Sequence, residues 1–289
     1  MKQSEITFPN SAHGQKFRWE LFLGINAIQI VGGPVALWYA ITYGLSLSAM
    51  ILFMVYTMMR GIGISVGYHR MLTHRSFKTH SEFLRKFLFY WGGVGGQNTL
   101  TWRANHDDHH RYGDTAQDPY SVYWPYNGGW RGAWWAHIGA LWHAYEPTIE
   151  ARKFAPDDPN KRAAEWEAKY HVLIFLSGFL VPFLLLGWKG LIFVGFTSLL
   201  YVFHMTWLVN SVCHLWGTKS PRGNKKGRNN LFVIILGFVG EGFHANHHAD
   251  PRAAILGPKW WHLDMGKWVI RLLEYTGLVY DVKPRRGLG

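Results

Sequence analysis

The sequence predicts an all-α integral membrane protein with four transmembrane helices and its remaining segments on one side of the membrane. Long uncharged stretches, a one-sided distribution of Lys and Arg, and clustered histidines support this fold class. Of the 289 residues, 48% are hydrophobic and only 17% are charged, whereas soluble domains average about 25% charged residues. The aromatic content of 17% excludes disorder, and the single cysteine excludes a disulfide framework.

The membrane spans are predicted from where charge is absent. No Asp, Glu, Lys or Arg occurs from Leu21 to Met59. As a helix, this stretch would be close to twice the ~30 Å thickness of the hydrocarbon core, so we expect a hairpin that breaks near Gly44. A second uncharged pair of stretches is separated by Lys189. The four predicted spans are residues 21–43, 46–66, 170–188 and 190–211.

Two shorter apolar stretches, residues 87–102 and 229–240, contain several glycines or are too short to cross a bilayer. We expect them to form helices that lie at the membrane surface or are buried against it. The alternative is a soluble α-helical protein in which all of these stretches are core helices. We regard this alternative as weaker, because uncharged runs of this length are rare outside lipid.

The distribution of positive charge predicts the orientation. The net charge is +12. Every Lys and Arg except Lys189 lies before the first span, between Arg60 and Lys169, or from Lys219 onward. By the positive-inside rule, both termini and the long middle segment are expected on the cytoplasmic side. Topology therefore accounts for the basic charge, and no nucleic-acid partner is expected.

Nine of the 16 histidines form four clusters. These clusters contain His69 and His74; His106, His109 and His110; His214; and His244, His247 and His248. The two H-x-x-H-H boxes have i, i+3, i+4 spacing, which places three rings on one face of a helix. Nine imidazoles suit two metal ions with four or five ligands each.

The spacing leaves the identity of the metal open. Zinc, which has no redox chemistry, would fit a hydrolase or a storage site, and iron would fit a site that binds and splits O₂. We interpret the other seven histidines as ordinary packed or solvated residues: His13, His80, His137, His143, His171, His204 and His262.

Longer motifs resemble one family. His69-Arg-x-x-x-His74 is followed by the second box with Asp118-Pro119, by Thr206-Trp-Leu-Val-Asn-Ser leading to His214-Leu-Trp-Gly, by Arg228-Asn-Asn, and by Gly240-Glu-Gly-Phe before the third box. Over about residues 67–256, the chain resembles the membrane fatty acid desaturases. The resemblance is strongest to the Δ9 acyl-CoA desaturase-like branch, which is also called stearoyl-CoA desaturase-like.

The resemblance implies a single desaturase domain over residues 1–289, with a cytosolic helical cap from residues 67–169 and 212–289. It implies a di-iron centre (Fe²⁺) held by the nine clustered histidines, with Asn210 reaching one iron through a water. It also implies that Trp102 and Thr206 line the bend of a substrate tunnel. Family members use O₂ and two electrons to introduce a cis double bond, so a Δ9 product is expected. Cytochrome b5 or ferredoxin, with an NAD(P)H reductase, would be a separate electron donor.

The chemistry fits these residue types. A methylene group offers no acidic proton, so its oxidation needs a cofactor that the protein positions. Nearby carboxylates are predicted to accept a hydrogen bond from the second ring N–H of a ligand histidine. The candidates are Asp107, Asp108, Asp114, Glu241 and Asp250.

The chain departs from the family pattern where animal acyl-CoA members carry basic residues that contact the CoA phosphates. It has Ala104 at one such position and Ala144-Tyr145 at another. The carrier therefore stays open among CoA, acyl carrier protein and membrane lipid, because phosphate recognition usually needs Arg or Lys. Two other functions stay open. A di-iron hydroxylase would share the metal site, and a metal-binding or metal-transport protein should carry its ligands inside the spans.

Overall fold

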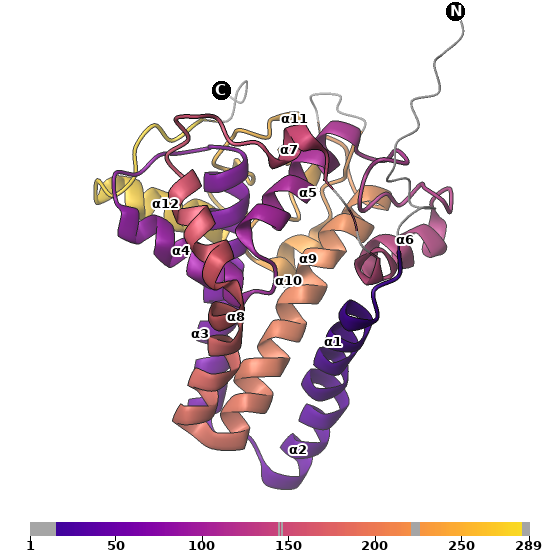
Figure 1. Ribbon diagram of the computed structural model, residues 1–289, viewed down its shortest axis with the longest axis vertical. Coiled ribbons are helices and arrows are strands. Elements are labelled where there is room, and N and C mark those ends of the chain that lie inside the picture. Colours follow the sequence, from indigo (N-terminus) through magenta and orange to yellow (C-terminus); the bar gives the residue numbers. More distant parts are fainter. Residues whose placement is uncertain (1–15, 144, 146, 221–225, 285–289) are drawn as a thin grey trace, which may run out of the picture.

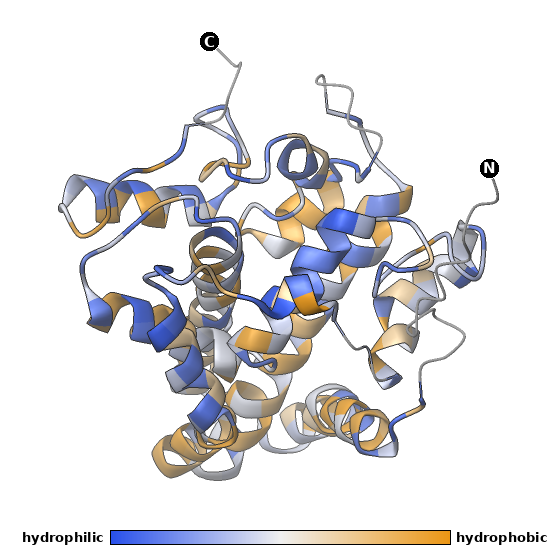
Figure 2. Ribbon diagram, turned by 45° about the horizontal axis from the view of Figure 1, so that its top comes forward, coloured by the Kyte–Doolittle hydropathy of each residue, from blue (hydrophilic) through white to orange (hydrophobic). Residues whose placement is uncertain are grey.

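The computed structural model of the chain describes residues 16–143, 145, 147–220 and 226–284. These residues fold into helices joined by loops, with isolated bridging pairs such as Lys78 with Tyr280. Two long helical hairpins extend from a broader group of short helices (Figure 1). Hydrophobic residues dominate the hairpins, and hydrophilic residues are concentrated on the short helices (Figure 2). The predicted all-α fold is confirmed.

The first hairpin turns where the sequence predicts. It comprises α1 (Trp19–Ile30), the π-helical turn η1 (Val31–Val35), α2 (Ala36–Tyr43), α3 (Leu47–Ile62) and the π-helical η2 (Gly63–Thr73). Gly44 has a φ of 67° at the turn, and Ser46 caps α3 by accepting from the N–H of Ala49. Pro34 lies inside η1. Proline has no backbone N–H, so one carbonyl of the preceding turn lacks its usual helical donor, and the wider π-helical turn accommodates this.

The second hairpin comprises α8 (Lys161–Lys189), the π-helical η4 (Gly190–Thr197) and α9 (Ser198–Leu215). The chain reverses at Gly187, whose φ of 58° and ψ of −143° interrupt the helix. By length and composition, three helices could cross a membrane: Trp19–Tyr43, Leu47–Thr73 and the 55-residue Lys161–Leu215. The third of these contains the reversal at Gly187 and is therefore the hairpin of α8 and α9. Its two helical halves correspond to the last two predicted spans.

Two helices extend beyond the predicted spans into the group of short helices. The helix that begins with α3 continues beyond residue 66 and contains His69, and α9 continues beyond residue 211 and contains His214. Both histidines lie in the polar ends of these helices, beyond the predicted spans. Helical hydrogen bonding continues past the last apolar residue because the polar ends of these helices are packed inside the cap.

Arg60, which the charge distribution groups with the cytoplasmic charges, lies between the hairpins and not on the surface of the cap. The side chain is fully buried in α3. Its guanidinium donates to the carbonyl oxygens of Gly195 at 3.0 Å and Gly178 at 3.2 Å. The first of these carbonyls belongs to η4, where π-helical geometry changes the usual backbone pairing. Arg60 therefore joins the two hairpins from inside.

The short helices form a cap over the hairpins (Figure 1). They are α4 (Glu82–Val94), α5 (Thr99–Tyr112), α6 (Gly129–His137), the 3₁₀ turn η3 (Gly139–Trp142), α7 (Ile149–Arg152), α10 (Leu231–Gly237), α11 (His244–Ala249) and α12 (Met265–Tyr275). The predicted 87–102 helix is broken, because α4 ends at Gly95-Gly96 and Asn98 starts α5 by accepting from the N–H of Thr101.

The main core packs η2 against α4 and α12. Its fully buried members include Leu72, Phe89 and Ile270. Burying each such side chain contributes about 1.5–3 kcal/mol. This core fixes the cap end of η2, and with it the first histidine cluster.

Candidate metal centre

Four helix ends position the clustered histidines. The last turns of η2 hold His69 and the following His74, and the end of α9 holds His214. The short helix α11 begins with the third box at His244, and α5 holds the second box in its C-terminal half. The predicted helical setting of both H-x-x-H-H boxes is confirmed.

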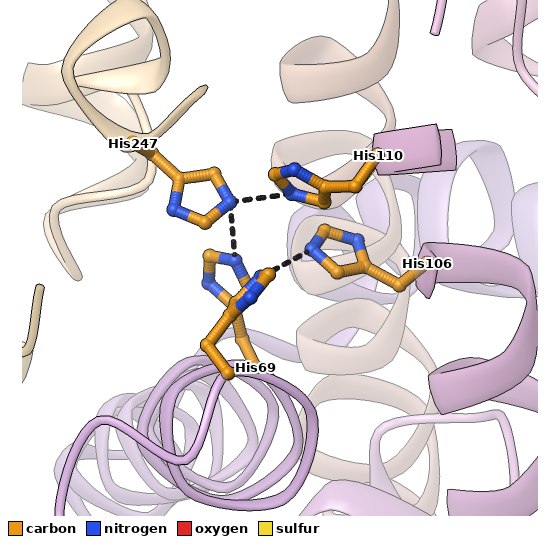
Figure 3. Close-up of side chains that lie close together, drawn as sticks. His69, His106, His110 and His247 are labelled. Carbon is orange, nitrogen blue, oxygen red and sulfur yellow. Dashed lines mark hydrogen bonds between the residues drawn. The ribbon is translucent and has the colours of Figure 1, made fainter. Parts of the chain in front are cut away.

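The nine histidines lie in two groups. The five-histidine group contains His69, His74, His106, His110 and His247, and the four-histidine group contains His109, His214, His244 and His248. Within each group, the candidate ligand atoms lie within 4.8 Å of one another. Figure 3 shows rings of the five-histidine group converging from η2, α5 and α11.

Each box divides between the two groups, which the sequence did not indicate. On α5, His106 and His110 belong to the five-histidine group, whereas His109 belongs to the other. On α11, His247 belongs to the five-histidine group, whereas its neighbours in the box belong to the other. The rings of His110 and His248 stack with centroids 4.5 Å apart. The two groups therefore lie side by side and share two helices.

The ring nitrogens are arranged to accept a cation. Within the five-histidine group, Nε2 of His247 lies 2.9 Å from Nε2 of His69 and 2.7 Å from Nε2 of His110. Burial, followed by the neighbouring imidazoles, holds the pKa of His247 and His110 well below the usual value. Nε2 of His109 is buried without a hydrogen-bond partner. Neutral imidazoles with converging lone pairs are good ligands for Fe, Zn, Cu and Ni, so these residues fit metal ions.

Carboxylates orient one histidine in the five-histidine group and two in the four-histidine group. Nδ1 of His109 lies 2.9 Å from Asp118, and Nδ1 of His214 lies 2.9 Å from Asp114. Nδ1 of His69 lies 2.7 Å from Glu241. A proton on Nδ1 leaves the lone pair on Nε2, which faces the group. Burial alone would lower the pKa of His109, but the carboxylate of Asp118 raises it above the usual value.

Asp114 and Glu241 are therefore placed as the sequence predicts, but two other carboxylate assignments change. Asp107 lies 3.4 Å from Arg103 on the same helix. Asp108 accepts from Thr148 and Tyr145 instead. Asp250 ends α11. The sequence did not predict Asp118 as the carboxylate partner of His109, although Asp118-Pro119 was among the motifs that carry the family resemblance. Proximity in sequence failed here because the loop after α5 folds back onto His109.

Two cavities meet beside the histidines. A narrow cavity of about 70 Å³ lies between α3, α9 and α10, and a wider one of about 420 Å³ lies between α1, α5 and α9. Trp102, Thr206 and Asn210 line both cavities, as does His106. The ring of Trp102 stacks on that of His106 with centroids 4.7 Å apart. These three residues, which the resemblance singled out, thus lie where the two cavities meet.

The remaining histidines of the described residues lie outside both groups. His137 and His204 form a pair, with ring nitrogens 3.0 Å apart, between α6 and α9. His80 stacks on Tyr280. The other histidines outside both groups are His143, His171 and His262. His13 and Ala144 lie outside the described residues.

The fold and the site define a helical, membrane-type protein whose buried histidines can hold two metal ions beside an apolar cavity. Sequence comparison identifies the family: the fatty acid desaturase profile matches residues 45–284. The chain belongs to the fatty acid desaturase family, and it is an oxidoreductase of that family.

Individual relatives agree with this assignment. The sn-1 stearoyl-lipid 9-desaturase of Anabaena variabilis is 33% identical over 80% of this chain and 82% of its own length. The Delta-9 acyl-lipid desaturase 1 of Arabidopsis thaliana is 34% identical over 79% of this chain and 73% of its own length. Acyl-CoA desaturase 1 of Saccharomyces cerevisiae is 30% identical over 90% of this chain but only 51% of its own length.

The carboxylate partners yield a first prediction. Exchanging Asp118 for Asn should lower metal affinity or desaturase activity about 10–100-fold, because Nδ1 of His109 loses its anionic partner. Asp107→Asn is the matched control, since Asp107 pairs with Arg103. Bound metal and desaturation are measured on both purified variants. Equal losses in the two variants would contradict the assigned role of Asp118.

Proposed function

We propose that this desaturase introduces a cis double bond, at Δ9, into a saturated acyl chain at a di-iron centre. The observation that supports it best is the position of the two histidine groups beside an apolar cavity. The five-histidine group would hold one iron and the four-histidine group the other, with Asn210 bound through a water. When bound, iron supplies the O₂ chemistry that an unactivated C–H bond requires, which zinc lacks.

The chain's own residues position the substrate. The narrow cavity, with a mainly apolar lining that includes Met205 and Val209, would receive the methyl end of the acyl chain. The wider cavity would hold the carboxyl end. Because Trp102 and Thr206 line both, they would fix which methylenes lie next to the metals. Positioning of this kind needs to be accurate to a fraction of an ångström.

A membrane lipid is the carrier that we propose. Arg18 is the only Lys or Arg among the described residues that line the wider cavity. Recognition of several CoA phosphates usually needs more Arg or Lys than this. Two of the relatives compared are named as acyl-lipid or stearoyl-lipid desaturases. The electrons would come from a separate cytochrome b5 or ferredoxin with its NAD(P)H reductase.

The proposed topology has four spans, formed by the two hairpins. Both termini and the metal centre would be cytoplasmic, which makes the protein multi-pass. The support is the positive-inside rule together with Lys189, the single Lys or Arg at the far end of the second hairpin. Cysteine accessibility at the Gly44 turn and at exposed cap positions would test the orientation.

A fatty acid profile tests the proposed reaction. The wild type and a His110→Ala variant are expressed in a host with a compatible donor, and total methyl esters are analysed for double-bond position. We expect a new cis-Δ9 monounsaturated acid in the wild type only. Supplying labelled stearoyl-CoA or labelled phospholipid to membranes then identifies the carrier. A hydroxy acid would contradict desaturation, and faster conversion of the CoA ester would contradict a lipid carrier.

A further inference from the structure

A group of large apolar side chains is exposed beside the narrow cavity. Leu231, Phe232 and Ile235 form the outer face of α10, and Trp260 and Trp261 lie in the loop before α12; all five are exposed. We call these five residues the apolar shelf. With Trp260 82% exposed and Leu231 70% exposed, the shelf is too apolar for an ordinary water-facing surface.

The two parts of the shelf are joined beneath the surface. Ile234 of α10 points inward and packs in one cluster with Phe243 and Leu256, to which Leu263 is added from the loop. His262 stacks on Phe243 with ring centroids 4.7 Å apart. The outer face of α10 and the tryptophan loop are therefore held as one surface.

A buried lysine fixes the loop that displays the tryptophans. Lys267 is only 7% exposed. Its ammonium donates to the carbonyl oxygens of Lys259 at 2.9 Å and His262 at 3.1 Å. These two carbonyls flank Trp260 and Trp261. The indoles are thus held outward by buried hydrogen bonds, and their exposure is a property of the fold.

Contacts of α10 with two long helices place the shelf beside the candidate spans. The O–H of Tyr201 donates to the carbonyl of Leu236 at 2.7 Å. The hydroxyl of Ser65 lies 3.4 Å from the carbonyl of Val239, two residues after the end of α10. Tyr201 and Ser65 both belong to helices that could cross a membrane. Therefore α10 lies against the sides of two candidate spans, and its outer face continues their apolar surface.

We propose that the apolar shelf is inserted into the lipid interface of the membrane that the hairpins cross. Continuity with the spans favours lipid over a protein partner. The composition also fits, since tryptophan is enriched at interfaces and lysine extends its ammonium toward headgroups. The ammonium of Lys259 lies 5.0 Å from the ring of Trp261, which places a cation at the edge of the shelf.

Insertion would separate the narrow cavity from water. Val233 of α10 lines that cavity, whereas Phe232 and Ile235 form the opposite, outer face of the same helix. One helix thus separates the cavity from whatever covers the shelf. With lipid on the outside, the apolar side chains of α10 stay dry on both faces, and the cavity wall gains hydrophobic stabilisation.

Site-specific fluorescence quenching tests the insertion. Trp261→Cys and Phe232→Cys are labelled with an environment-sensitive fluorophore and reconstituted into phosphatidylcholine vesicles. Some of the lipid carries a nitroxide high on the acyl chain. Cys213 is buried, so the wild-type chain serves as the labelling blank. Ile51→Cys on the exposed side of α3 is the lipid reference, and Glu150→Cys on α7 is the solvent reference.

We expect both shelf labels to show a blue-shifted emission and strong quenching by the lipid nitroxide, like Ile51→Cys. We also expect them to lose most of the iodide quenching that Glu150→Cys shows. If either label is quenched by iodide as strongly as Glu150→Cys, that part of the shelf faces water and the proposal is overturned. The readout is independent of desaturation, so it does not depend on the proposed reaction or carrier.

Discussion

Replacing His247 with alanine is expected to abolish desaturation and to empty the five-histidine group of metal. His247 lies between His69 and His110, with its Nε2 within 2.9 Å of both partners. Its removal deletes a candidate ligand and leaves a gap the size of an imidazole ring in a buried site. The loss should exceed the about 10–100-fold effect expected when only an outer carboxylate partner of a ligand is removed.

The measurement combines iron per chain with product formation in the same preparation. His80→Ala is the matched control, because His80 is exposed and stacks on Tyr280 away from both groups. We expect the control to keep the metal content and activity of the wild type. Thermal unfolding of both variants separates loss of metal from loss of fold. Full activity in His247→Ala would remove the five-histidine group from the mechanism.

The second large effect is expected at Asp264, a fully buried carboxylate at the start of α12. Asp264 accepts from Arg70 at 2.9 Å and from the backbone N–H of Lys267 at 2.9 Å, so it both pairs a buried cation and caps a helix. Asp264→Ala would leave Arg70 buried without this partner, at a cost of about 3–5 kcal/mol.

Asp264→Ala should also affect the candidate metal centre. Arg70 lies 3.6 Å from Glu241, which contacts His69. Without Asp264, the guanidinium would compete with His69 for Glu241. We therefore expect Asp264→Ala to lower bound metal as well as the free energy of unfolding.

Thermal unfolding in detergent measures the stability effect. Arg271→Ala is the control on the same helix, because its pair with Glu274 is exposed and should contribute at most about 1 kcal/mol. Asp264→Asn keeps the shape of the side chain and is expected to fall between the two. The assigned role of Asp264 is wrong if Asp264→Ala unfolds at the same temperature as Arg271→Ala.

Much of the site could be predicted from the sequence because its signals are local. The spacing of His106, His109 and His110 is set by helix periodicity, which a short window of sequence contains. The uncharged runs likewise predicted the hairpins. Trp102 and Thr206 were found only through the family resemblance, and their meeting at two cavities depends on how α5 packs against α9.

By itself, the sequence determined the helical class, the hairpins and the histidines that gather in the cap. Only the tertiary structure decided which histidine joins which group, that Asp118 rather than Asp107 contacts a clustered histidine, and that Arg60 is buried. The reason is physical. Periodicity and hydropathy act between near neighbours in the chain, whereas each of these contacts joins side chains brought together by packing. Asp118 reaches His109 only because a loop turns back, and Arg60 reaches Gly195 only because two hairpins pack together.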